Sequence, residues 1–568
     1  MKLFNKKILL ISEFCRQNIF VKAILVNLVY MMGTVLVFKP FLSITDYQEW
    51  ETIAGAYTGE TDYHTKFVQF WYAKIIMFLT NVNADIPWYS VVYYLLIFIS
   101  LSAITVLILK GNDRKIVWII INLLLLFFSY EFYIYIQFTK VAAVVGTAGY
   151  FIMLSSKTRK RVKPFGVIMI FISFLVRFQI AEMLLASWVI VTIICEIKNY
   201  VLYKKVYIRR YIFLVVAYCA IASFFWIIPT FKYSNDSERE KWSLIWQWNE
   251  VRSSVQDFVP PDYDENIDFY SKEHISKNDL YIWYNWNNDY SELSLETGKK
   301  LINLEPEKGS VIAKATEFEN VLAFFKVFPL QFLTIDVCYY CVIIVILNCL
   351  YNKKGLFRIN ILVQTMVLLA FEYYLFINER YLQHRVDVSI IFSIIICSMY
   401  FIENEGMLCE IRVGKKFVGI CCILLICVPY KYYSDDISYI SESTLKNNRN
   451  FFESTYNDEE HYYLIGNSRN KCASSQECYN AFEPIKAGIK RNIIMGLSPD
   501  NEDMLHNIGI ENPFLEVINN KRMYFVLDDD TNDEAAWEMY FSEIYGEPVY
   551  LQLEKTEFDR NIYFVMSE

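Results

Sequence analysis

Long runs of apolar residues, separated by short polar turns, dominate the chain between residues 19 and 428. A helix needs about 20 mostly apolar residues to cross a bilayer. By that measure the pattern predicts about eleven transmembrane helices and an α-helical polytopic membrane protein. The helices are centred on 19–38, 88–109, 116–136, 141–154, 165–176, 181–197, 211–228, 333–350, 359–377, 386–402 and 417–428.

Lysine and arginine gather in alternate connections between these runs. They cluster in the tail 1–18 and in the turns 110–115, 157–163, 198–210 and 352–358. Because basic residues favour the cytoplasmic side, threading the eleven helices in order places all five segments in the cytoplasm. The chain is therefore predicted to lie in the plasma membrane, with its N-terminus inside and its C-terminus outside. We expect the first helix to remain as an anchor, since no small-residue cleavage site follows it.

Three segments are then predicted to be exported. The first, 39–87, contains an amphipathic stretch at 66–80 that we expect to lie on the membrane surface. A short spanning helix is the alternative there, but it would invert every later loop. The second segment, 230–320, is an acidic loop rich in Trp and Tyr. The third is the tail 431–568, where RMYFVLDD and NIYFVMSE alternate like strands and DEAAWEMYFSEIYG has helical spacing. The predicted map is a cytoplasmic tail 1–18, helices one to seven in 19–229, helices eight to eleven in 321–430, and a small exported α/β domain in 431–568.

Composition narrows the classes of function. The chain is 55% hydrophobic and 20% charged, against about 25% charged residues in a soluble protein. Its net charge of -8 leaves no basic surface for nucleic acid. Among 13 cysteines, only Cys472 and Cys478 fall in the exported tail, where they could form a local disulfide or stay as thiols. No paired CxxC motif is present and the histidines are scattered, so no structural zinc site is predicted.

Ionisable residues within apolar helices are costly and usually line a cavity or pathway. Here they gather toward the predicted outer ends of the helices. Glu131, Glu372 and Asp387 lie there without an assigned role. The candidate substrate-binding residues are Lys140, Arg177, Glu182, Arg380, His384 and Arg385. The candidate catalytic residues, in the first exported loop, are Asp46, Glu49 and Asp62.

These residue types suit one kind of chemistry. Guanidinium groups recognise phosphate and carboxylate in a bidentate manner. A carboxylate near a phosphate site can act as a general base on a hydroxyl group. The set therefore predicts an outward-facing cavity beside the membrane. For any one of these residues taken alone, the alternative is a helix-capping ion pair or an interfacial anchor.

The order of segments resembles a known superfamily. An uncleaved first helix leads into the acidic SITDYQEWETIAGAYTGETDYH, followed by an amphipathic helix, many spans and an exported C-terminal domain. This arrangement resembles the C-type superfamily of polytopic glycosyltransferases, the GT-C enzymes. The segments GAYTGETDYH, KWSLIWQWNEVRSSVQDF, PDYDENIDFY and ISKNDLYIWYNWN also resemble a group of large, uncharacterised bacterial membrane proteins.

The resemblance implies a site as well as a fold. GT-C enzymes take sugars from polyprenyl-phosphate or polyprenyl-diphosphate carriers at the outer face, with a catalytic Asp or Glu in the first exported loop. By position Asp46 matches best, with Glu49 and Asp62 in reserve. Arginines at outer helix ends hold the carrier phosphate in the superfamily, and the corresponding residues here are Arg177, Arg380 and Arg385.

The leading hypothesis is an inverting membrane glycosyltransferase of surface-polysaccharide or cell-wall glycan assembly. Its partners would be a polyprenyl-phosphate-linked sugar, a glycan or lipid acceptor, and the bilayer. No cofactor is predicted, and a divalent metal near Asp46 is left open because no ligand cluster demands one.

Three alternatives stay open. The first is a polysaccharide polymerase or ligase that uses lipid-diphosphate substrates. The second is a transporter or flippase of lipid-linked glycans, which the absence of a visible repeat and the low counts of Gly (18) and Pro (13) disfavour. The third is a scaffold whose tail binds a partner, since the tail contains neither GxSxG nor HExxH.

Overall fold

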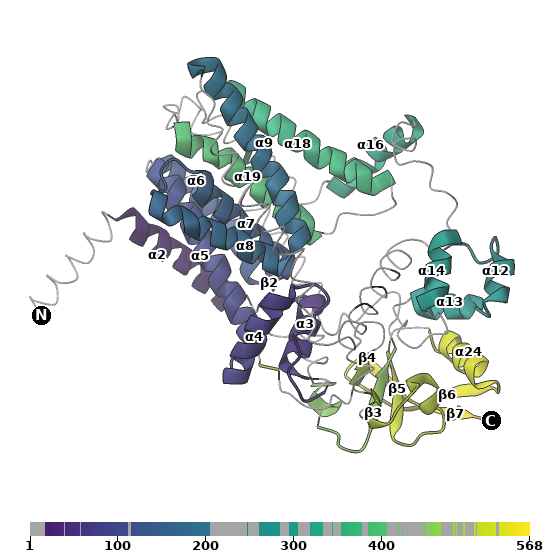
Figure 1. The fold of residues 1–568 in the computed structure, drawn as a ribbon. Coiled ribbons are helices and arrows are strands. Elements are labelled where there is room, and N and C mark those ends of the chain that lie inside the picture. The colour runs from purple at the N-terminus through teal and green to yellow at the C-terminus, as the bar shows by residue number, and fades with distance from the viewer. Residues whose placement is uncertain are drawn as a thin grey trace, which may run out of the picture. The chain divides into compact units, whose positions relative to one another are not determined.

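The computed structural model describes residues 18–204 apart from 39, 57 and 112–114, and then 261–284, 295–304, 318–332, 354–377, 384–405, 457–466, 508–529 and 533–568, with a few shorter pieces between them. The chain divides into two units (Figure 1). Unit 1 comprises Met1–Phe41, Tyr89–Lys232 and Ile312–Ile437. Unit 2 comprises Leu42–Trp88, Tyr233–Val311 and Ser438–Glu568.

Unit 1 is a bundle of apolar helices. Within the described residues, the segments Ile19–Val37, Trp88–Lys110 and Phe178–Val201 are long and apolar enough to cross a membrane. Large apolar side chains remain exposed on the bundle, including Val29 (68%) and Leu36 (78%). Such a surface is unfavourable in water and suits lipid. The helices are α2 (Ile19–Val37), α5 (Trp88–Gly111), α6 (Lys115–Tyr133), α7 (Phe138–Leu154), α8 (Lys163–Val176), α9 (Phe178–Tyr203), α16 (Phe318–Phe332), α18 (Lys354–Ile377) and α19 (His384–Glu405).

Eight of the predicted helices correspond to these elements, and their limits shift by a few residues. The predicted spans 211–228, 333–350 and 417–428 lie wholly or largely outside the described residues. The count of eleven therefore stays a prediction, as do the two sides of the membrane. Cys472 and Cys478 also lie outside the described residues.

Small residues let α7 and α8 approach closely. A Cβ atom on Gly149 would lie 2.7 Å from the carbonyl oxygen of Gly166, and one on Gly166 would lie 2.8 Å from that of Gly149. This is the small-residue packing that allows membrane helices to meet backbone to backbone. Next to this contact the Ser173 hydroxyl donates to the Ala142 carbonyl over 2.7 Å. α7 is buried along its whole length and forms the centre of the bundle.

One end of the bundle is fixed by a two-stranded pairing. β1 (Phe41–Leu42) pairs with β2 (Tyr135–Ile136), which follows α6. The Phe41 N–H donates to the Ile134 carbonyl over 2.8 Å, and its ring lies 4.9 Å from that of Tyr135. The end of α2 therefore lies beside the turn between α6 and α7.

The first loop of unit 2 forms two helices, α3 (Ile44–Ala54) and α4 (Phe70–Val82). α3 ends at Gly55, whose positive φ of 73° and close approach to Glu60 exclude a side chain. α4 begins four residues later than the predicted helix, at Phe70. Its 13 residues extend about 20 Å, less than the roughly 30 Å hydrocarbon core. One side is buried and the other exposes Trp71, Ile75, Phe78 and Val82, which favours a surface helix over a spanning one.

The tail forms the predicted α/β domain. Its five strands are β3 (Tyr462–Ile465), β4 (Asn492–Ile494), β5 (Met523–Asp528), β6 (Val549–Glu557) and β7 (Arg560–Ser567), in the order β4-β3-β5-β7-β6. β3 is parallel to β4 and β5, whereas β7 is antiparallel to β5 and β6. Alternation along β5 sends Phe525 and Leu527 to a core shared with Trp537 of α24 (Glu534–Tyr545), and Val526 to the other face. A short helix, α23 (Pro513–Glu516), precedes β5.

The described part of the loop 230–320 contributes one helix to the core of this domain. It contains α12 (Ile267–Lys272), α13 (Lys277–Tyr284) and α14 (Leu295–Leu304). Ile282 of α13 is fully buried in the cluster that holds Trp537. The Tyr281 hydroxyl donates to Asp533 over 2.8 Å, and the Ser276 hydroxyl donates to Glu543 over 2.8 Å. Two segments that the sequence pattern separates therefore fold together.

Candidate active site

Polar side chains on α3 are buried to an uncommon extent. Asp46, Glu49 and Glu51 have exposed fractions of 0%, 4% and 2%. Carboxylates are rarely buried unless their charge is compensated or used, and groups of this kind concentrate at functional sites. Asp46 and Glu49 are three positions apart, so they lie on neighbouring parts of the helix surface.

Asp46 forms the start of α3 together with Ser43. The Ser43 hydroxyl donates to the Asp46 carboxylate over 2.6 Å, and the Asp46 backbone N–H donates back to that hydroxyl over 3.3 Å. This reciprocal pair satisfies a backbone donor that the first turn would otherwise leave unpaired. Asp46, predicted as the catalytic base, is thus bonded to the N-cap residue Ser43, and its side chain is fully covered in this structure.

Glu49 connects α3 to the segment that precedes α4. One of its oxygens, Oε1, accepts from the backbone N–H groups of Lys66 and Phe67 over 2.9 and 3.1 Å. The second oxygen, Oε2, is buried and has no hydrogen-bond partner. Burial raises the pKa of Glu49 to about 7, against the lowering effect of the two N–H donors. A carboxyl group that titrates near neutral pH is suited to general-base catalysis.

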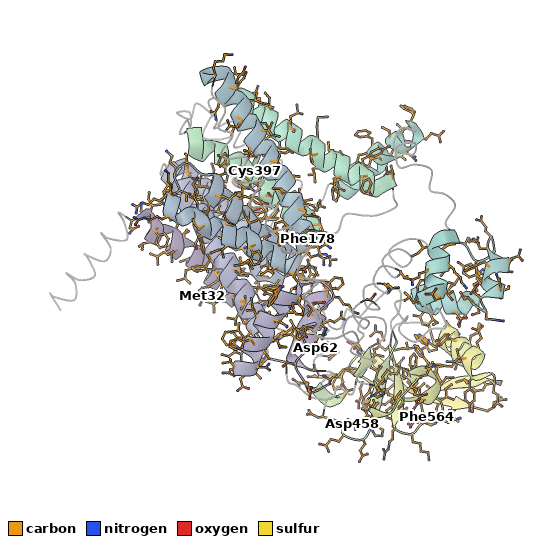
Figure 2. All side chains as sticks on the ribbon, viewed as in Figure 1. Met32, Asp62, Phe178, Cys397, Asp458 and Phe564 are labelled. Carbon is orange, nitrogen blue, oxygen red and sulfur yellow. The ribbon has the colours of Figure 1, made fainter. Side chains whose placement is uncertain are left out.

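Asp62 lies on the connection between α3 and α4, and its side chain is labelled in Figure 2. Its carboxylate accepts the backbone N–H of His64 over 3.0 Å and contacts Nδ1 of the same residue. The Lys74 ammonium group lies 4.4 Å from the centre of the Tyr63 ring, which stacks beside His64. The side chain of Asp62 is 26% exposed, so it is more accessible than Asp46 or Glu49.

A second group of charges lies in unit 1, where α6 ends and α7 and α19 begin. Glu131 Oε2 accepts from the Lys140 ammonium group over 2.7 Å and lies 3.3 Å from Nε2 of His384. The side chains of Glu131 and Lys140 are 2% and 1% exposed, whereas that of His384 is 35% exposed. Two consecutive helices and a third one far along the chain thus bring an acid, a lysine and a histidine together.

The described contacts of Lys140 are to Glu131 and Tyr135. It donates to the Glu131 carboxylate and to the Glu131 carbonyl, the latter over 3.2 Å, and it lies 4.7 Å from the centre of the Tyr135 ring. An ammonium group has three N–H donors, and two of them are used by Glu131. Lys140, predicted to bind substrate, is placed here to hold Glu131.

The other predicted binding residues lie at the same helix ends. Arg177 connects α8 to α9, and its guanidinium group lies 5.1 Å from the centre of the Phe138 ring at the start of α7. Arg385 is the second residue of α19 and is half-buried, whereas Glu182 on α9 is exposed. Glu372, near the end of α18, is hydrogen-bonded to Asp387 of α19. Arg380 lies outside the described residues.

The structure thus joins Lys140 and His384 through Glu131, and it places Asp46 and Glu49 on one helix. Ser43 was not selected from the sequence, although Ser43-x-x-Asp46 at the start of a helix is a recognisable capping pattern. The contact of Glu131 with His384 joins positions 253 residues apart, and a single sequence carries no signal of it. Over the described residues no group of three or more His, Cys, Asp or Glu side chains could hold a metal ion.

Comparison with known proteins gives a weak likeness. No family model matches the chain, and no curated protein matches it. Two solved structures of ArnT from Cupriavidus metallidurans are similar. The one bound to undecaprenyl phosphate has 10% identity and a TM-score of 0.37, and the apo one has 9% and 0.35. Each match covers 96% of this chain and 97% of the other. At these values the likeness is weak, and nothing below depends on it.

Proposed function

We propose that the chain is a membrane glycosyltransferase that takes a sugar from a polyprenyl-phosphate carrier at the outer face of the plasma membrane, in surface-polysaccharide or cell-wall glycan assembly. The observation that carries the proposal is the group of Glu131, Lys140 and His384 at one end of an apolar helix bundle. Charges at that depth are costly and mark sites that handle ions or polar headgroups. A phosphate headgroup on an apolar tail fits such a position.

The residues divide into two roles. Arg177, Arg385 and Arg380 bind the carrier phosphate, because guanidinium groups form paired hydrogen bonds with phosphate oxygens. Asp46 removes the proton from the acceptor hydroxyl. The oxygen then bonds to the anomeric carbon, the bond between that carbon and the phosphate oxygen breaks, and the carrier leaves as polyprenyl phosphate. The arginines stabilise the charge that develops on this leaving group.

The fully buried position of Asp46 sets a condition on this scheme. The acceptor can reach the carboxylate only if the residues that cover it move when substrate binds. Glu49 is the second candidate base, since its pKa of about 7 matches a general base at neutral pH. Asp62, which contacts His64, is the third.

A complementation experiment tests the proposal. Cells that lack the chain receive the wild type, Asp46→Asn or Asp85→Asn, where Asp85 is an exposed acid of the same loop. We expect the wild type and Asp85→Asn to restore one sugar of the surface glycan, and Asp46→Asn to accumulate at normal abundance without restoring it. Transfer of whole oligosaccharide blocks would support the polymerase or ligase instead. Unchanged surface glycan in cells without the chain would reject the proposal.

A further inference from the structure

Glu131 is buried, and only one of its two carboxylate oxygens has polar partners. Its Oε2 atom contacts both Lys140 and His384, at 2.7 and 3.3 Å. Its Oε1 atom is buried and has no hydrogen-bond partner. A buried carboxylate that held the fold alone would use both oxygens, because each unpaired one costs free energy. The arrangement instead places one oxygen between a lysine and a histidine, so that the ammonium group and the imidazole share it.

The three groups differ in exposure. Lys140 and Glu131 are almost fully buried, and the His384 side chain is 35% exposed. Only His384 therefore extends from the pair to the surface at the start of α19. An imidazole changes its charge between about pH 5 and 8, whereas lysine side chains ordinarily titrate well above that range. His384 is thus the member of the group whose charge can vary under physiological conditions.

We propose that Glu131 and Lys140 are positioning residues that set the proton occupancy of His384, and that protonated His384 provides positive charge for the phosphate of the lipid donor. The second half of this inference rests on the proposed function. Glu131 attracts the imidazolium and Lys140 repels it, so the pair balances the two effects. Both side chains are almost fully buried, so His384 is the member of the group placed to meet the donor.

Other charged groups lie at the same end of the bundle and also act on His384. Arg385 and Asp387 lie on α19 itself, and Glu372 of α18 is hydrogen-bonded to Asp387. Arg177 and Glu182 lie where α9 begins. All of them stay unchanged when Glu131 or Lys140 is replaced, so the replacements isolate the contribution of the pair.

The two replacements have opposite expected effects. In Lys140→Met the full charge of Glu131 acts on His384, which keeps its proton to higher pH. In Glu131→Gln the Lys140 charge is left beside His384, which loses its proton at lower pH. A charge within about 4–6 Å moves a titration by about one pH unit or more. The double variant Glu131→Gln/Lys140→Met removes both charges. Its His384 should lose its proton at a pH between those of the two single variants.

The first measurement needs no substrate. The melting temperature of the full chain in lipid nanodiscs is followed from pH 5 to pH 8. Every variant keeps the fall in stability that Glu49 causes as pH rises, so each slope is compared with that of the same variant carrying His384→Gln. Protonated His384 stabilises Lys140→Met, so this variant loses more stability as pH rises than its His384→Gln derivative. Protonation opposes Lys140 in Glu131→Gln, so that variant loses less stability as pH rises than its His384→Gln derivative. Equal slopes in the two variants, or slopes that His384→Gln does not change, overturn the inference.

One variant could fail to accumulate, since Glu131→Gln leaves a buried lysine without its counter-charge. In that case Lys140→Met is compared with the double variant. The double variant must titrate at lower pH than Lys140→Met, and coincident titrations overturn the inference.

The second measurement is the binding of undecaprenyl phosphate over the same pH range. We expect binding to weaken about tenfold as His384 loses its proton, at higher pH in Lys140→Met than in the double variant. Stability slopes that differ between the variants as expected, with no undecaprenyl phosphate binding, would reject the lipid-phosphate function and leave the control of His384 intact. Binding of undecaprenyl phosphate without a difference between the stability slopes would support the lipid-phosphate function and reject the control of His384 by Glu131 and Lys140.

Discussion

The Ser43 hydroxyl donates to the Asp46 carboxylate over 2.6 Å, and the Asp46 amide donates to the Ser43 hydroxyl over 3.3 Å. The residue proposed as the base is therefore held by the helix cap in a single orientation. A catalytic group gains from such support, because a proton-accepting oxygen must be positioned to within a fraction of an ångström.

Ser43→Ala should lower both stability and transfer. Loss of an N-cap hydroxyl costs about 1 kcal/mol, and Asp46 loses its hydrogen-bond donor. Ser43→Thr keeps the hydroxyl and serves as the matched control. We expect transfer to fall severalfold in Ser43→Ala and to stay near wild type in Ser43→Thr, measured on purified protein. Equal activity of the two variants would show that the cap does not position Asp46.

Glu49 should make stability depend on pH. Its pKa lies at about 7 when folded against 4.5 as the ordinary value, because of burial. The folded chain therefore binds the proton more tightly, so this stability is complete below pH 4.5 and is lost as pH rises through 7. The loss amounts to about 3 kcal/mol.

Replacement of Glu49 by Gln removes this titration. Thermal melts between pH 5 and pH 8 should fall steeply for the wild type and much less for Glu49→Gln. Glu60→Gln, which changes an exposed acid of the same loop, should keep the wild-type slope. A wild-type slope in Glu49→Gln would assign the pH dependence to another group.

The contact between Gly149 and Gly166 should tolerate no side chain. A Cβ atom at either position would lie under 3.0 Å from the opposite backbone oxygen. Gly166→Ala should therefore destabilise the bundle by about 1–3 kcal/mol. Gly355→Ala is the control, since nothing lies within 4 Å of a Cβ there. Protein abundance in membranes and melting temperature measure the difference, and equal values for both variants would contradict the close approach of α7 and α8.

Ile282 should couple the loop helices to the C-terminal sheet. The side chain is fully buried beside Trp537, and Ile→Ala in a core costs about 2–5 kcal/mol. Ile267→Ala, at a residue 51% exposed, should cost little. Limited proteolysis of the full chain should cut within 261–304 sooner in Ile282→Ala than in Ile267→Ala. Identical digestion patterns would indicate that α13 folds independently of the domain.

The sequence predicts the helices and strands of this protein better than the contacts between them. The apolar runs place α5 and α8 within a few residues, because lipid requires helices of a certain length and composition. Alternation identifies β5 and β7, and helical spacing identifies α24.

Long-range contacts could not be predicted in this way. The packing of Ile282 against Trp537 and the contact of Glu131 with His384 depend on which faces meet in three dimensions. Local polarity indicates that a residue is buried or exposed, but it does not name the partner. For that reason the sequence predicts that Lys140 binds substrate, whereas in the structure Lys140 contacts Glu131.

The central claim is sugar transfer from a polyprenyl-phosphate carrier. The most direct measurement incubates the purified full chain with the total lipid extract and a glycan acceptor fraction of its host cells, and follows lipid-linked sugars by mass spectrometry. The account predicts that one polyprenyl-phosphate sugar disappears and free polyprenyl phosphate forms with the wild type and with Arg358→Ala. Asp46→Asn should form none, and Arg385→Ala should need at least tenfold more donor, since a hydrogen bond to a charged group contributes about 1.5–3 kcal/mol. An unchanged set of lipid-linked sugars with the wild type would contradict the claim.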